Sequence, residues 1–263
     1  MDRKDILEIA IQATMAASDK IMEIYSRDFS VEEKEDKSPL TEADTAAHLI
    51  IKAHLDETAY PILSEEGKII DYKERAAWET YWCVDPIDGT KEFIKRNGEF
   101  TVNIALIHQQ VPVLGVIYAP VLNTLYFAEE NVGSYKVQLE DFNDLDLLIE
   151  SATALPSESP EVYTIVGSRS HMSEETNQFV EILKQEHGEV EIVSKGSSLK
   201  LCMVAEGSAN CYPRYAPTME WDTAAGQAIA KLSGAEVIDF DTKEQLIYNK
   251  ENLRNPWFTV QRN

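Results

Sequence analysis

The most constraining feature of this sequence is an apolar run that ends abruptly in acidic residues. Tyr81-Trp82-Cys83-Val84 is followed at once by Asp85-Pro86-Ile87-Asp88-Gly89-Thr90, and Tyr60-Pro61-Ile62-Leu63 leads in the same way into Ser64-Glu65-Glu66-Gly67. Buried strands show this pattern when their tips reach a cleft. The chain is therefore expected to fold around a sheet that presents acidic side chains to a cleft.

Helical and strand patterns mix along the chain without strict alternation. Apolar residues at steps of three and four predict a helix over the first 25 residues, whereas residues 31–38 lack periodicity and are expected to form an exposed, mobile loop. Strands at 100–107, 113–118 and 124–128 predict an antiparallel meander. Further on, a strand is expected at 163–166, with helices at 173–185, at 198–205 and from Trp221 to Gly234.

Thr41 and Asp44 have the spacing of a helix capping box, ahead of the run His48-Leu49-Ile50-Ile51. A second helix is therefore expected to begin here, and a cap by itself would explain Asp44 without any chemistry.

The segment 138–160 is rich in Asp, Glu, Ser and Pro and indicates a boundary between two halves. With 263 residues, of which 44% are hydrophobic, the chain can bury a substantial core. We expect an N-terminal α+β half over 1–145 that carries most of the acidic clusters, and a C-terminal α/β half over 146–263 that carries Asp222.

The charge balance excludes some partners. The chain has 46 acidic and 24 basic residues, which gives a formal net charge of -22 and argues against nucleic acid polymers and anionic membrane surfaces. A small anion can still bind where divalent cations or a local basic cluster reverse the sign. Three unpaired cysteines, and no segment apolar enough for a signal peptide or a transmembrane helix, fit a reducing cytoplasm.

Three acidic clusters are candidates for metal binding: Glu65-Glu66, Asp85-Pro86-Ile87-Asp88, and Asp222 after Trp221. Mg²⁺ prefers oxygen ligands, and a pair of ions needs carboxylates from different elements, which Glu65, Asp85, Asp88 and Asp222 supply. Taken alone, the first and third clusters are better explained as helix caps and turns. The middle cluster favours function, because a turn needs neither two acids around a proline nor the Gly-Thr that follows.

Other phosphoryl-transfer chemistries lack their motifs. Phosphatases with an aspartyl nucleophile carry Asp-x-Asp-x-Thr, but Pro86 stands where the first Asp would be, which favours water activated by metal. The chain contains no Gly-x-x-x-x-Gly-Lys loop and no Gly-x-Gly-x-x-Gly, so ATP hydrolysis and dinucleotide binding have no support.

The three acidic motifs, in this order and spacing, resemble those of the lithium-sensitive, Mg²⁺-dependent inositol monophosphatase superfamily. The stretches 91–100, Gly167-Ser168-Arg169-Ser170-His171 and Gly196-Ser197-Ser198-Leu199-Lys200 are similar to its bacterial 3'(2'),5'-bisphosphate nucleotidase branch. The resemblance covers nearly the whole chain and is weakest over 130–160. It implies a layered α/β sandwich like that of inositol monophosphatase and fructose bisphosphatase, with alternating αβαβα layers.

The resemblance also implies residue roles. Two or three Mg²⁺ ions would be held by Glu65, Asp85, Asp88, Asp222 and the carbonyl of Ile87. Asp44 and Thr90 would orient and deprotonate the attacking water with help from Glu66, and the scissile phosphate would rest on the metals and on the N–H groups of Gly89 and Thr90. The base and the remaining phosphate would contact Ser168, Arg169, His171, Ser197, Lys200 and Arg214.

Simpler roles remain for several of these basic residues. Arg169 fits a solvated turn before a helix, and Lys200 fits a helix surface. Lys91, Lys95 and Arg96 are an alternative source of positive charge, although a charged helix face explains them too.

Three hypotheses follow. The first is hydrolysis of adenosine 3',5'-bisphosphate to AMP and phosphate, extended to its sulfated analogue, with a role in sulfur assimilation and recycling of the bisphosphate. The second keeps the chemistry but takes inositol monophosphate or a sugar bisphosphate. The third is an acidic protein that binds cations or senses a nucleotide without turnover. The sequence leaves the oligomeric state and any peripheral association with the inner membrane open.

Overall fold

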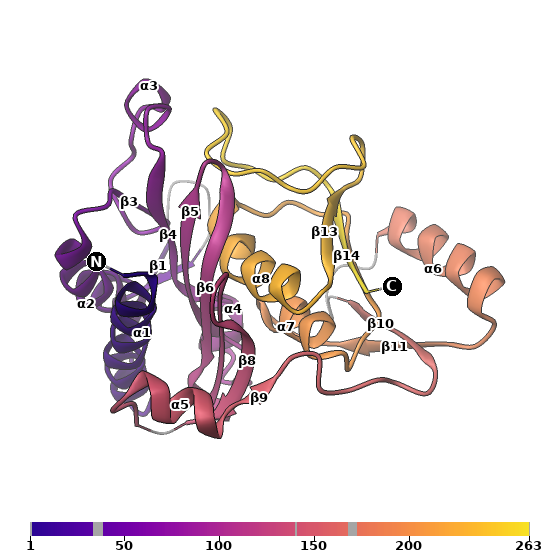
Figure 1. The fold of residues 1–263 in the computed structure, drawn as a ribbon, viewed down its shortest axis with the longest axis horizontal. Coiled ribbons are helices and arrows are strands. Elements are labelled where there is room, and N and C mark those ends of the chain that lie inside the picture. The colour runs from indigo at the N-terminus through magenta and orange to yellow at the C-terminus, as the bar shows by residue number, and fades with distance from the viewer. Residues whose placement is uncertain (1, 34–38, 140, 168–172, 263) are drawn as a thin grey trace.

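The computed structural model describes residues 2–33, 39–139, 141–167 and 173–262 (Figure 1). Its helices are α1 (Arg3–Tyr25), α2 (Glu42–Leu55), α3 (Tyr72–Arg75), α4 (Thr90–Ile94), α5 (Leu145–Ser151), α6 (Glu174–His187), α7 (Leu199–Glu206) and α8 (Glu220–Leu232), with 3-10 turns η1 (Asp56–Thr58) and η2 (Pro120–Leu122). Within these ranges the predicted helices are all found, each within a few residues of its predicted bounds.

The larger sheet has seven strands in the order β3-β4-β5-β6-β7-β8-β9. They are β3 (Ile62–Ser64), β4 (Thr80–Asp88), β5 (Thr101–His108), β6 (Val111–Ala119), β7 (Thr124–Glu129), β8 (Gly133–Gln138) and β9 (Thr153–Ala154). All neighbours pair antiparallel except β3 and β4, which run parallel. The predicted meander is confirmed, and the parallel pair brings the ends of β3 and β4 to the same edge.

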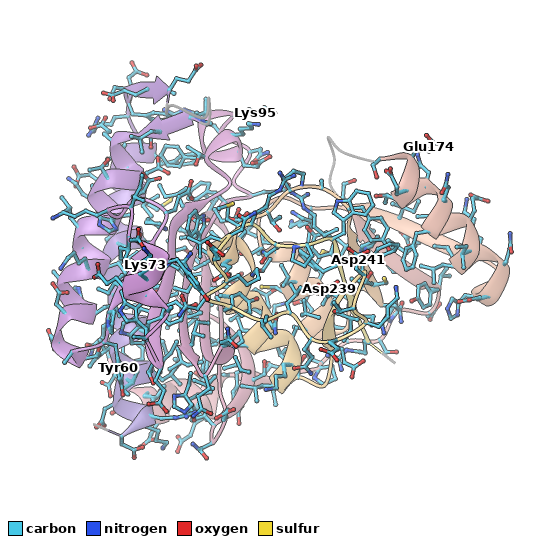
Figure 2. The ribbon with its side chains drawn as sticks, turned by 90° about the horizontal axis from the view of Figure 1, so that it is seen from above. Tyr60, Lys73, Lys95, Glu174, Asp239 and Asp241 are labelled. Carbon is cyan, nitrogen blue, oxygen red and sulfur yellow. The ribbon has the colours of Figure 1, made fainter. Side chains whose placement is uncertain are left out.

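A second sheet has the order β11-β10-β12-β14-β13. Its strands are β10 (Tyr163–Gly167), β11 (Val190–Ser194), β12 (Cys211–Arg214), β13 (Glu236–Asp239) and β14 (Phe258–Gln261). Figure 1 shows the layers in sequence: α1 and α2, the larger sheet, α7 and α8, the second sheet, and α6 on the outside. In Figure 2, Glu174 at the start of α6 lies on the side of the molecule away from α1 and α2. The predicted αβαβα layering is confirmed.

Helix α8 packs closely on the larger sheet. A Cβ atom placed on Gly115 of β6 would stand 2.4 Å from the carbonyl oxygen of Ala225 and 2.9 Å from the Cβ of Ala228, so only glycine permits this approach. The contact fixes the helix that carries Asp222 against the sheet that carries Asp85.

One local prediction is wrong. Val31–Glu33 is not part of a loop but forms β1, which pairs with β2 (Pro39–Thr41); the prediction for 34–38 lies outside the described residues. The predicted boundary segment 138–160 contains α5, which Asp144 caps, and β9, which pairs with β8. The division of the chain at residues 145 and 146 stays a prediction.

In the part of the chain that the structure describes, no helix is both long enough and apolar enough to cross a membrane. The three cysteines are buried free thiols.

Candidate active site

The parallel pairing of β3 and β4 places two predicted ligands beside each other. Ser64 lies opposite Val84, and the backbone N–H of Glu65 donates to the carbonyl of Val84 at 3.1 Å. Glu65 therefore leaves its strand next to Asp85, which is almost completely buried.

The end of β4 is irregular where it pairs with β5. The register shifts between Asp85, opposite Asn103, and Asp88, opposite Thr101. The Asp85 carboxylate accepts the N–H of Ile87 at 3.0 Å, which fixes the intervening residues. The strand continues through Pro86 to Asp88, and a β-bulge accommodates the extra residues.

Asp44 serves as a helix cap and also faces the site. Its Oδ2 accepts the N–H of Thr41 at 2.8 Å and the hydroxyl of Thr41 at 2.6 Å, which confirms the capping box. Its Oδ1 accepts the hydroxyl of Thr90 at 3.3 Å. Thr90 also lies 3.4 Å from the carbonyl oxygen of Ile87 and begins α4 directly after Gly89, whose φ of +94° favours glycine. The cap and a role in the site are therefore compatible.

Asp222 reaches the site from the first turn of α8. Its Oδ2 accepts the N–H of Met219 at 2.9 Å, as an acid three residues after a helix cap does. The preceding Trp221 packs against the core.

The acidic side chains strongly affect one another's protonation. Burial raises the pKa of Asp85 well above its ordinary value, and the charges of Glu65 and Asp88 raise it further. Burial raises the pKa of Asp222 to about 8, with the charge of Asp88 as the next cause and Arg214 acting in the opposite direction. These carboxylates therefore form an electrostatically strained cluster.

The chemistry of this donor set fits hard divalent cations, which bind carboxylate and carbonyl oxygens and offset the mutual repulsion. Among the described residues, no three His, Cys, Asp or Glu side chains already stand in an arrangement that could hold a metal ion. The pKa shifts nevertheless show that the carboxylates act on one another across the site, and a cation would relieve that repulsion.

The metal-free fold is expected to lose stability as the pH rises from 6.5 to 7.5. Asp85 and Asp222 bind protons more tightly when folded than when unfolded, so their contribution is complete below pH 4 and is lost as the pH rises through the raised folded pKa. We expect the free energy of unfolding to fall by about 1–2.5 kcal/mol over this unit, since each group contributes at most about 1.4 kcal/mol per pH unit.

The range from pH 6.5 to 7.5 avoids two groups whose titration would change the free energy of unfolding in the opposite direction. His48, whose pKa is lowered by burial, matters below pH 6.5, and Lys200, whose pKa burial lowers to about 8, matters above pH 7.5. Urea unfolding in EDTA at both pH values measures the change, and saturating Mg²⁺ should remove it because bound metal requires deprotonated ligands. Equal stability in EDTA at both pH values would contradict the strained cluster.

A cavity of about 460 Å³ opens beside these acids. Asp88, Gly89 and Asp222 line it from the acidic side, and Ser197, Lys200 and Arg214 line it from the other. The predicted metal ligands Asp88 and Asp222 therefore share one cavity with the three described residues of the predicted substrate pocket.

Lys200 is a buried cation in this cavity rather than a helix-surface residue. Its Nζ donates to the carbonyl oxygens of Ser197 at 2.6 Å and Lys195 at 3.3 Å, and it lies 5.6 Å from the ring centre of Tyr212. The charges of Asp88 and other nearby acids partly offset the effect of burial on its pKa. At neutral pH the side chain remains mostly protonated.

Ser197 and Arg214 shape the same wall. Ser197 has a φ of +56° and donates its hydroxyl to the Asp88 carbonyl at 3.0 Å, so it joins the two sides of the cavity. Arg214 donates one Nη to the Pro217 carbonyl at 3.1 Å, and its buried Nε has no hydrogen-bond acceptor among the described residues. The Arg214 guanidinium therefore has one N–H donor, on Nε, that is not used within the described protein.

The remaining predictions divide into two groups. Glu66 is half-buried after β3, and Lys91 and Lys95 line the cavity. Ser168, Arg169 and His171 lie outside the described residues.

Sequence reasoning missed Lys195, Glu99 and Tyr212 in the cavity wall. Glu99 accepts the N–H of Gly196 at 2.9 Å and lies 3.6 Å from Lys195 Nζ, so it fixes the loop before α7. Lys195 immediately precedes the stretch 196–200, and Glu99 lies inside the stretch 91–100. Both stretches can be recognised in the sequence, but only the fold brings them together.

The model of the inositol monophosphatase family matches residues 2–258. The chain is 45% identical to the 3'(2'),5'-bisphosphate nucleotidase CysQ of Salmonella typhimurium, over 97% of this chain and 99% of that protein. It is 44% identical to the protein of the same name from Escherichia coli K12, over the same shares.

Solved structures agree. The crystal structure of CysQ from Bacteroides thetaiotaomicron superposes with a TM-score of 0.91 at 51% identity, covering 98% of this chain and 97% of that one. An IMPase from Thermotoga maritima gives 0.70 at 25% identity, covering 98% and 92%.

Proposed function

Since the chain belongs to the inositol monophosphatase family, we propose that it is a Mg²⁺-dependent 3'(2'),5'-bisphosphate nucleotidase that converts adenosine 3',5'-bisphosphate to AMP and phosphate. The observation that carries the proposal is the single cavity in which Asp88 and Asp222 face the buried cation Lys200 and the partly exposed cation Arg214. The relatives named as 3'(2'),5'-bisphosphate nucleotidases support the same choice.

The proposed metal ligands are Glu65, Asp85, Asp88, Asp222 and the Ile87 carbonyl, for two or three Mg²⁺ ions. Bound Mg²⁺ would supply Lewis acid activation of water and charge stabilisation at the transferred phosphoryl group. Burial and the neighbouring acidic charges raise the pKa values of Asp85 and Asp222, so these two carboxylates would exchange protons for a cation, which is the chemistry such a site needs.

Asp44 and Thr90 are proposed to handle the proton of the attacking water. The Thr90 hydroxyl donates to Asp44, so its oxygen is free to accept a hydrogen bond from water in the site. Asp44 is held by Thr41 and cannot rotate away without losing the helix cap, so the pair is preorganised. Glu66 is proposed to assist from the end of β3.

The second phosphate of the substrate would account for the basic residues on the cavity wall opposite the acids. A bisphosphate brings more negative charge than a monoester, and a chain with a formal charge of -22 needs local cations to hold it. This phosphate or the ribose is proposed to contact three groups: the Lys200 ammonium, the unused Nε–H of Arg214 and the Ser197 hydroxyl. Gly89 and Thr90 are proposed to face the scissile phosphate.

We extend the proposal to the sulfated analogue of the substrate and to a role in sulfur assimilation. Three buried, unpaired thiols support a reducing, cytoplasmic setting.

The test compares phosphate release from adenosine 3',5'-bisphosphate, inositol 1-phosphate and fructose 1,6-bisphosphate, each with Mg²⁺, with EDTA, and with Mg²⁺ plus Li⁺. Mg²⁺-dependent, Li⁺-sensitive release that strongly favours the nucleotide is expected. Preference for inositol or sugar phosphate would retain the carboxylate site and overturn the nucleotide pocket. Cation binding without release from any substrate would overturn the enzymatic proposal.

A further inference from the structure

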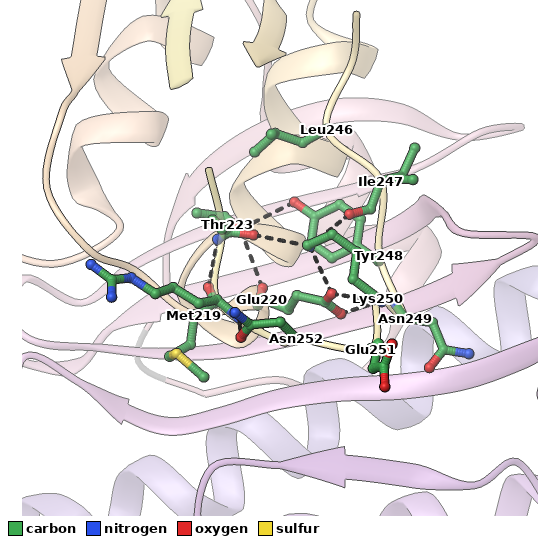
Figure 3. A network of polar contacts seen from close by, with 12 residues as sticks. Met219, Glu220, Thr223, Leu246, Ile247, Tyr248, Asn249, Lys250, Glu251 and Asn252 are labelled. Atoms are coloured by element: carbon green, nitrogen blue, oxygen red, sulfur yellow. Dashed lines mark hydrogen bonds and ion pairs between the residues drawn. The ribbon is translucent and has the colours of Figure 1, made fainter. Parts of the chain in front are cut away.

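The first turn of α8, which carries Asp222, is held by a loop formed by residues 246–255 (Figure 3). Glu220 is fully buried two residues before Asp222. Its carboxylate accepts the N–H of Asn249 at 2.7 Å, the N–H of Lys250 at 3.0 Å and the Lys250 ammonium at 2.7 Å. All of these donors come from the 246–255 loop.

The same loop contacts the helix turn at other points. The Asn255 side chain donates to the Met219 carbonyl at 2.7 Å and to the Thr223 hydroxyl at 3.0 Å, and the Tyr248 hydroxyl donates to Thr223 at 3.1 Å. The Glu220 N–H donates to the Leu253 carbonyl at 2.9 Å. Figure 3 shows the loop running alongside the helix start.

Arg75 ties the loop to the other side of the site. This buried residue ends α3, between Glu65 and the strand that carries Asp85. Its guanidinium donates to the Asn249 side chain at 2.9 Å and to the carbonyl of Lys250 at 2.6 Å, and its own carbonyl accepts from Asn249 at 2.6 Å. The loop therefore bonds both to the first turn of α8 and to the segment that separates Glu65 from Asp85.

We propose that the 246–255 loop, through Glu220, Lys250 and Arg75, positions Asp222 relative to Glu65 and Asp85 and so sets the affinity of the site for Mg²⁺. The inference rests on the proposed metal site. None of the three residues lines the cavity, so they are positioning residues that act through the backbone of α8 and of the loop. A buried carboxylate with a full set of donors is a rigid anchor, because any displacement leaves polar groups unpaired.

For the variant Lys250→Met, the change in charge and the loss of positioning predict opposite changes in Mg²⁺ affinity. Lys250→Met removes a positive charge, which by simple electrostatics would tighten Mg²⁺ binding. If the loop positions Asp222, the same variant weakens Mg²⁺ binding. Outer-shell substitutions weaken metal sites by roughly 10- to 100-fold, and we expect an increase of roughly 10-fold in the dissociation constant.

Isothermal titration of Mg²⁺ into the metal-free protein, without substrate, measures the constant. Lys250→Met leaves Glu220 charged in the interior, so E220Q/K250M is used if the single variant does not fold; it preserves the net charge, so electrostatics predicts no change and only loss of positioning weakens Mg²⁺ binding. Glu206→Gln is the matched control: Glu206 is a buried carboxylate paired with Lys136 at 2.5 Å, and it does not line the cavity.

Weaker Mg²⁺ binding in K250M or E220Q/K250M, with unchanged binding in E206Q, would support the inference. An unchanged or tighter constant would overturn it, whatever the change in melting temperature. Substrate hydrolysis by the unmodified protein is measured separately. Absence of nucleotide hydrolysis would overturn the proposed substrate, whereas weaker Mg²⁺ binding in the loop variants would still support the positioning role.

Discussion

Asp85→Asn is expected to lower kcat for adenosine 3',5'-bisphosphate by roughly 1,000-fold and to stabilise the metal-free protein at neutral pH. The loss of activity follows from removing a central carboxylate of the proposed Mg²⁺ site, where several kcal/mol of transition-state stabilisation depend on bound metal. The gain in stability follows because burial and the neighbouring acids disfavour the ionised carboxylate in the folded protein. One substitution therefore moves the two properties in opposite directions.

Initial rates at saturating Mg²⁺ and urea unfolding in EDTA measure these changes. Asp144→Asn, which alters the cap of α5 and does not line the cavity, is the control for a general effect of the substitution. A D85N protein that loses activity together with stability would indicate simple misfolding instead. Retained activity would remove Asp85 from the metal site.

Lys200→Met is expected to lower kcat/KM for adenosine 3',5'-bisphosphate by roughly 30-fold or more while leaving inositol 1-phosphate within about threefold. The nucleotide's second phosphate would lose a buried ammonium, whereas a single phosphate on the metal site would not. The pKa of Lys200 near 8 adds a signature, since the ammonium loses its proton above that pH. The kcat/KM of the unmodified enzyme for the bisphosphate should decline above pH 8, and this decline should be missing in K200M.

Steady-state rates with both substrates between pH 7 and 9 test this prediction. The Lys200 Nζ also holds the carbonyls of Ser197 and Lys195, so the substrate comparison within one variant is decisive: a damaged loop would slow both substrates. Lys243→Met, an exposed lysine over the Phe240 ring, is the control for loss of positive charge. Equal losses for the two substrates would remove Lys200 from phosphate recognition.

Local signals predicted most of the fold. The capping box at Thr41, the apolar period of α1 and the short runs of the meander are each set by neighbours within a few residues, so they can be recognised in the sequence. Val31–Glu33 could not be predicted, because its strand conformation depends on pairing with β2, which lies further along the chain.

The candidate site was predictable only in part. The acids at the ends of β3 and β4 follow apolar runs and are visible locally. Their convergence with Asp222 depends on the packing of α8 on β6, for which the sequence offers only the small residues Gly115 and Ala225. The anchoring role of Glu220 was equally hidden, because its partners lie about thirty positions later in the chain.

The packing of α8 also has a consequence for synthesis on the ribosome. One face of the larger sheet is covered by α1 and α2, which are made first. Its other face is covered by α8, which is made near the end of synthesis. A nascent chain that has completed β9 therefore still exposes the apolar surface around Gly115, Ile117 and Tyr126. Chains truncated before α8 should aggregate, and the growing chain should be most vulnerable to association while the C-terminal third is being made.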